Sequence, residues 1–206
     1  MRTSQTTLSP SLRRGFESLR AQREAFFPTI EGFEVEMLWR RPTDTGWAIG
    51  DTVQHLCKTM RVYWFLIRVS WPVLYPMAWL FRNRSFERST RDIFAEYQAA
   101  GKRMKATGLL VPHRPDRLPP LNELREELNA ETNRMEGMLA GIPEGVAGHF
   151  RIFDPGVGSP NLIQRVQLLA FHERHHFKIM EDLIAQGATE FWKKDVRRKG
   201  LETSKA

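Results

Sequence analysis

Apolar residues recur every three or four positions in four long stretches of the chain. This is the spacing of one face of an α-helix. The stretches cover roughly 9–28, 47–67, 121–140 and 159–187. No alternation of useful length, as a half-buried β-strand would show, occurs between them. The pattern therefore predicts an all-α protein, a four-helix bundle with short extra helices.

The last of these stretches carries the clearest helix signals. Ser159 is predicted to cap its start, Pro160 to be its first residue, and Gly187 to end it. The residues that share its inward face are Leu162, Val166, Leu169, His172, His176, Ile179 and Leu183. Two histidines are therefore expected on the side of the helix that faces the core.

The segment 62–81 is almost wholly apolar and has the length of a membrane span. Arg68 lies inside it, and Pro72 and Pro76 are expected to break its regularity. Three interpretations stay open: a buried core or dimer surface, which the pattern favours, an interfacial contact with a membrane, and a true span.

Length and composition indicate one domain of ordinary size. We predict that it covers 9–187, with an apolar, Trp- and Pro-rich insertion over about 64–120 and a basic tail at 188–206. The single cysteine, Cys57, excludes an internal disulfide framework and is expected in the core. The first residues lack the apolar core of a secretory signal, so a cytoplasmic location is expected, with a peripheral membrane contact as the variant.

The net charge of +7 comes from 31 basic and 24 acidic residues. Basic patches can contact nucleic acid or anionic lipid. No nucleic-acid recognition motif of the usual kinds is present, so we expect no nucleic-acid partner.

Histidines supply the candidate chemistry. His172 and His176 are four positions apart, so both side chains lie on one face of the predicted helix, one turn apart. His55, at the edge of the apolar face of the second helix, is the best candidate for a third ligand. Three histidines with an open position are typical of a catalytic metal site, although imidazole suits several metals.

A second interpretation of the same helix is a zinc protease. The segment 172–176 reads H-E-x-x-H, in which Glu173 would be the general base. The extended form of that motif requires glycine and histidine where this chain has Ile179 and Asp182. The protease is therefore the lesser alternative.

The other histidines are expected to have accessory roles or none. His175 lies about 100° around the helix from His176 and is interpreted as a flanking residue. His113 and His149 lie in predicted loops, where both are expected to be exposed to solvent.

Two motifs resemble those of the DinB-like superfamily. One is R-P-T-D-T-G-W-A-I at 41–49 followed by His55-Leu56, and the other is F-H-E-R-H-H at 171–176. The resemblance implies a four-helix bundle in which His55, His172 and His176 hold a divalent metal, commonly zinc or nickel. It also implies frequent dimers. His175 departs from the pattern, since many members carry arginine there, and so does the apolar insertion.

The resemblance further implies that some members are metal-dependent hydrolases and others S-transferases that use a low-molecular-weight thiol such as bacillithiol or mycothiol. We therefore expect an enzyme that acts on a small molecule, and we interpret Glu173 as a residue that flanks a metal ligand and helps to orient it. The alternative is a non-catalytic module for metal or ligand binding in a stress response, with association with a membrane as its variant.

Overall fold

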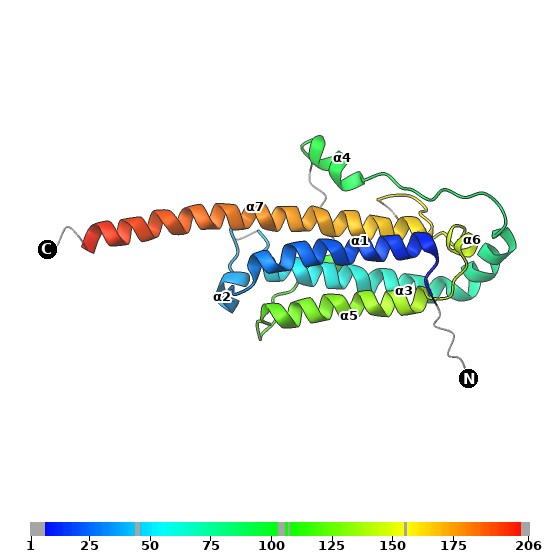
Figure 1. The fold of residues 1–206 in the computed structure, drawn as a ribbon, viewed down its shortest axis with the longest axis horizontal. Helices are drawn as coiled ribbons and strands as arrows, with labels where there is room; N and C mark the ends of the chain where they lie inside the picture. The colour runs from blue at the N-terminus through cyan, green and yellow to red at the C-terminus, as the bar shows by residue number, and fades with distance from the viewer. Residues whose placement is uncertain (1–6, 44–45, 103–105, 107, 155, 203–206) are drawn as a thin grey trace.

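Four long helices form the body of the protein: α1 (Pro10–Phe26), α3 (Ile49–Phe81), α5 (Leu121–Leu139) and α7 (Leu162–Glu202). α1 and α7 run in one direction and α3 and α5 in the opposite one (Figure 1). This is a computed structural model, which describes residues 7–43, 46–102, 106, 108–154 and 156–202, with side chains up to residue 187. The prediction of an all-α four-helix bundle is confirmed.

The bundle is held together by two helix pairs, α1 with α7 and α3 with α5, which share an apolar core. Phe26 of α1 stacks on Phe177 of α7 with ring centroids 4.4 Å apart. Gly15 lets the two backbones approach, because a Cβ atom there would lie 2.6 Å from Cγ1 of Val166. Burial of each such aromatic side chain contributes on the order of 2 kcal/mol.

Both predicted ends of the last helix are wrong. α7 begins after Asn161, whose side chain accepts a hydrogen bond from the Gln164 backbone, and the Gln164 side chain accepts one from the Asn161 backbone, both at 3.0 Å. This reciprocal capping box satisfies N–H groups that Ser159 was expected to satisfy. The helix also continues past Gly187 to Glu202, because an internal glycine costs only about 1 kcal/mol relative to alanine.

The predicted break in the apolar segment is wrong too. Pro72 and Pro76 lie inside α3, which is continuous to Phe81. Both prolines are exposed, so the carbonyl groups that lose their helical donors can bond to water instead. Within the described residues, no helix is long and apolar enough to cross a membrane.

A long connection returns from the end of α3 along the length of the bundle to the start of α5 (Figure 1). It is fastened to α7, because the side chains of Asn161, Gln164 and Gln167 bond to the backbone of 87–90 at 2.7–3.1 Å. These contacts bring α4 (Ile93–Ala99), which belongs to the connection, against α7. The other short elements are η1 (Phe27–Ile30), α2 (Val35–Leu38), η2 (Gly108–Leu110) and α6 (Glu144–Ala147).

We predict opposite effects for alanine at two helical glycines. Gly15→Ala should lower the free energy of unfolding by about 1–3 kcal/mol, because its methyl group overpacks the α1–α7 contact. Gly137→Ala should raise it by about 0.5–1 kcal/mol, since nothing lies within 4 Å of a Cβ atom there. Urea unfolding of both variants beside the wild type checks this; equal effects would contradict the close approach.

Candidate metal centre

His55 lies in the second turn of α3 and is buried. Its Nδ1 atom is 2.7 Å from the carbonyl oxygen of Leu110, the last residue of η2. A carbonyl can only accept, so Nδ1 carries the proton and donates it. Nε2 is left with its lone pair facing away from η2, which is the form of histidine that binds metals.

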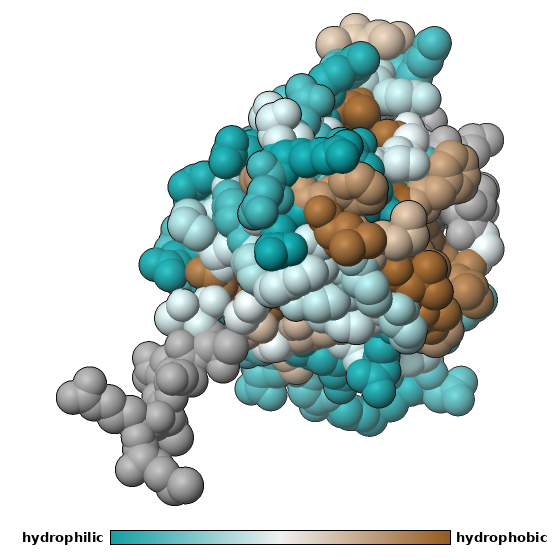
Figure 2. Space-filling view, turned by 90° about the vertical axis from the view of Figure 1, so that its right-hand side faces the viewer, coloured by the Kyte–Doolittle hydropathy of each residue, from teal (hydrophilic) through white to brown (hydrophobic). Residues whose placement is uncertain are grey.

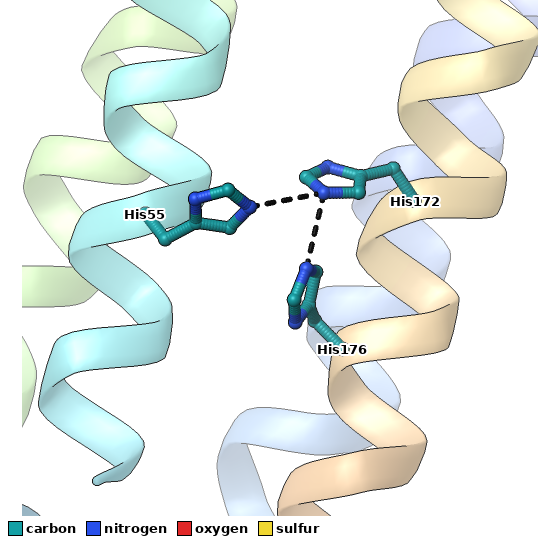
Figure 3. Close-up of side chains that lie close together, drawn as sticks. All are labelled: His55, His172 and His176. Carbon is teal, nitrogen blue, oxygen red and sulfur yellow. Dashed lines mark hydrogen bonds between the residues drawn. The ribbon is translucent and has the colours of Figure 1, made fainter. Parts of the chain in front are cut away.

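His172 and His176 of α7 complete a cluster with His55 (Figure 3). Nε2 of His172 is 3.1 Å from Nε2 of His55 and 3.0 Å from Nε2 of His176. The ligand atoms of all three side chains lie within 4.8 Å of one another. In a tetrahedral zinc site with ordinary bond lengths, nitrogen ligands are about 3.3 Å apart. Two of the three spacings are close to this value, so the cluster could hold one metal ion.

The hydrogen bonding within the cluster also fits a cation. Nε2 of His172 contacts two other ring nitrogens, yet a neutral imidazole nitrogen can donate only one hydrogen bond. Without a cation, at least one of these two contacts therefore lacks a hydrogen bond. A metal ion that accepts all three lone pairs would remove this conflict.

Burial keeps the three rings neutral. It lowers the pKa of His55 and lowers the pKa of His172 and His176 well below the ordinary value for histidine. The neighbouring imidazoles lower the pKa of His172 and His176 further, because they oppose additional positive charge in the cluster. Since metal binding requires neutral imidazole, the site is prepared for a metal ion near neutral pH.

Two aromatic side chains border the cluster. The Trp47 ring lies 4.9 Å from the His55 ring and is stacked 6.2 Å from the His176 ring, between centroids. Phe94 of α4 lies 5.1 Å from the His172 ring. The cluster is thus flanked by apolar surface from two segments that are distant in the sequence.

Each border residue is held in place by an ion pair. Asp51 accepts two hydrogen bonds from Arg41, at 2.8 and 3.0 Å, and one from the backbone of Ala48 at 3.0 Å. It thereby fixes the loop that carries Trp47 and caps α3. Asp92, which precedes α4, pairs with Arg174 of α7 and also caps α4. Phe94 is therefore fixed beside the histidines.

Glu173 does not face the cluster. Its Oε1 atom pairs with Nε of Arg23 of α1 at 2.8 Å, and both side chains are almost fully buried. Burial raises the pKa of this carboxyl to about 7, and Arg23 opposes the rise. The structure thus places Glu173 in the α1–α7 interface, which removes the general base that the zinc protease interpretation needs.

The remaining candidates lie outside the group of ligand atoms. His175 stacks on Phe94, 5.7 Å between centroids, beside the cluster. His113 is exposed, whereas His149 is half-buried and bonded to the carbonyl of Gly145 at 2.7 Å. Cys57 is buried, as predicted, and burial raises the pKa of its thiol.

Sequence reasoning missed four residues that shape the site: Asp51, Asp92, Phe94 and Leu110. Asp51 could have been recognised from the sequence, because it stands three positions after Ala48, the residue that caps α3. An acidic side chain at that position commonly accepts a hydrogen bond from the backbone of the capping residue. Phe94 and Leu110 had no such signal, since only the path of the long connection brings them to the histidines.

We predict that Glu173 acts on stability. Glu173→Gln should lower the free energy of unfolding by roughly 3 kcal/mol, because it leaves the buried guanidinium of Arg23 without a countercharge. The matched control is Glu181→Gln on the exposed side of the same helix, which should change it by less than about 0.5 kcal/mol. Similar urea unfolding curves for the two variants would contradict the buried ion pair.

Comparison with known proteins agrees with this arrangement. The family model of the DinB superfamily matches residues 18–180, which include all three clustered histidines. This match covers most of the chain, and the chain belongs to that superfamily. Searches of curated proteins and of solved structures found no match.

Proposed function

We propose that this member of the DinB superfamily is a metal-dependent enzyme acting on a small molecule, with His55, His172 and His176 as the ligands of one divalent ion. The observation that carries the proposal is the meeting of three neutral ring nitrogens, drawn from two helices, within 4.8 Å. Zinc and nickel both suit imidazole ligands.

The number of protein ligands favours catalysis over a purely structural role. Structural zinc sites are normally closed by four side chains, whereas catalytic ones keep a position for water or substrate. Among the described residues, the cluster consists of three side chains. When bound there, a divalent metal would lower the pKa of a water or thiol in its open position and so supply hydroxide or thiolate at neutral pH.

The chain's own residues would orient the reactants. The Leu110 carbonyl fixes the ring of His55 and its tautomer. Trp47 and Phe94 border the cluster with apolar surface, which favours a substrate with an apolar part and limits the access of bulk water. His175 stacks on Phe94 outside the group of ligand atoms.

Thiol transfer is the reaction that we favour over hydrolysis. Hydrolysis at H-E-x-x-H sites uses the glutamate as the base that activates water, and here Glu173 is paired with Arg23. In thiol transfer the nucleophile is the thiol sulfur itself, so no base is needed to activate water. Its sulfur would form a bond to an electrophilic carbon, the bond from that carbon to the leaving group would break with its electron pair, and the thiol proton would pass to solvent.

We predict that metal binding depends on the cross-helix ligand. Wild-type protein purified without a metal-affinity tag should hold about one equivalent of metal, and His55→Ala should lose it, because two ligands remain of three. His175→Ala is the matched control and should keep its metal, since its ring lies outside the cluster. Elemental analysis of the three proteins checks this.

The alternatives give different results in the same measurement. Metal retained by His55→Ala would contradict the three-histidine site. Metal bound in a site with no exchangeable water would favour the non-catalytic module.

We also predict metal-dependent turnover in screens with low-molecular-weight thiols and small electrophiles. His172→Ala should reduce turnover by about three orders of magnitude, as expected when a nucleophile loses its activating metal. His175→Ala should keep most of the activity. Turnover that survives a chelator, or that needs water but no thiol, would contradict thiol transfer.

A further inference from the structure

The second half of α3 exposes a continuous apolar face. Its side chains are spaced by three or four positions, so they form one ridge on the side of the helix opposite the buried residues Ile67 and Ala78. Their exposed fractions are 58% for Phe65, 60% for Val69, 64% for Val73, 52% for Met77 and 76% for Leu80. We call these five residues the α3 ridge. A continuous exposed apolar surface of this kind is typical of a site that contacts another protein or a membrane.

The end of the molecule that carries the C-terminus of α3 shows the same contrast from outside (Figure 2). Apolar side chains, in brown, extend from the middle of this view to its right-hand side, and hydrophilic ones, in teal, lie mainly to the left and below. A shallow hollow of about 500 Å³ beside the ridge is lined by Tyr75, Pro76, Trp79 and Leu80. Tyrosine and tryptophan at the border of an apolar surface are typical of the boundary between lipid and water.

Within the segment that carries the ridge, every charged residue is basic. From Val62 to Phe86 the chain contains three arginines and no acidic residue. The guanidinium groups of Arg68, Arg82 and Arg84 lie over the rings of Trp64, Trp79 and Phe81, at 5.7, 4.5 and 4.8 Å from the ring centroids. The ridge therefore has apolar surface in the middle and positive charge along its border.

We propose that the α3 ridge docks on an anionic lipid bilayer, with α3 lying parallel to the membrane surface. The ridge residues would enter the boundary between headgroups and acyl chains, and Arg68, Arg82 and Arg84 would contact lipid phosphates. Apolar burial and electrostatic attraction act together in such contacts, and neither alone gives stable binding.

Charge argues against a second copy of the chain as the occupant. A two-fold symmetric contact pairs the same surface with itself, so each end of the ridge would face either the opposite end or its own copy. One end carries Lys58 and Arg61, and the other carries Arg82 and Arg84. Arg61 is already paired with Glu127 and Glu131 of its own chain, but the other three would repel across the interface.

The prolines on this side of α3 also favour a hydrated contact. Because proline has no N–H group, Pro72 and Pro76 leave the carbonyls of Arg68 and Pro72 without helical donors. These carbonyls would be costly in a dry protein interface. At headgroup depth they keep water as a partner.

The proposed surface is separate from the histidine cluster. His55 lies near the start of α3 and Val73 in its second half, about 27 Å further along the helix axis at the usual rise per residue. The membrane contact therefore does not depend on the proposed metal chemistry, and each can fail without the other.

Flotation with lipid vesicles tests the proposal on the full chain. Wild-type protein should float with vesicles that contain 30 mol% phosphatidylglycerol in phosphatidylcholine, about a hundredfold more strongly than with pure phosphatidylcholine. Val69→Asp/Val73→Asp should weaken binding to the anionic vesicles at least about tenfold, because it places charge on the ridge. Phe153→Asp, an equally exposed apolar residue outside the ridge, is the control and should bind as the wild type does.

Circular dichroism and light scattering on the same variants complete the test. Both changed valines are exposed, so unchanged helix content should show that the bundle is intact. Three results would overturn the proposal: absence of wild-type binding to the anionic vesicles, equal binding of the ridge variant, or a wild-type dimer that the ridge variant dissociates. The last result would assign the ridge to a second copy.

Discussion

The packing of α7 against the bundle decides whether three imidazole rings meet at one point. The carbonyl of Leu110 fixes the ring of His55. His172 and His176 can therefore meet it only if α7 has the right axial position and rotation. Arg23 and Glu173 form a buried ion pair between α1 and α7 immediately beside His172. Removing either partner would leave a buried charge, which is costly, so the pair holds α7 in one register. Glu173 thus serves the histidines through the position of their helix.

The long connection between α3 and α5 gives the cluster its surroundings. It is fastened along α7 by the side chains of Asn161, Gln164 and Gln167, and then by the pair of Asp92 and Arg174. These contacts place Phe94 next to His172, and the following segment brings the Leu110 carbonyl to His55. A segment without long helices of its own therefore supplies both an aromatic border and the hydrogen bond that selects a tautomer.

α3 joins two regions with different chemistry. Its first turns are capped by Asp51 and carry His55 in a buried polar environment. Its second half keeps one face in the core, through Ile67 and Ala78, and exposes the α3 ridge on the other. A helix that is apolar all round is normally buried on all sides. The second half of α3 is buried on one face only, so its exposed apolar face is expected to contact a partner surface.

The sequence by itself determined the four helices and the pairing of His172 with His176, because helical periodicity and the spacing of these two histidines are local properties of the chain. The placement of His55 beside them also drew on the family resemblance. Local signals failed at Ser159, Gly187 and the prolines of α3, where the capping partner and the exposure of the helix face decided the outcome. Only the tertiary structure showed that Glu173 faces Arg23 and that Phe94 and Leu110 reach the cluster. These contacts join residues far apart in the sequence, and they depend on helix rotation and on the path of a long connection.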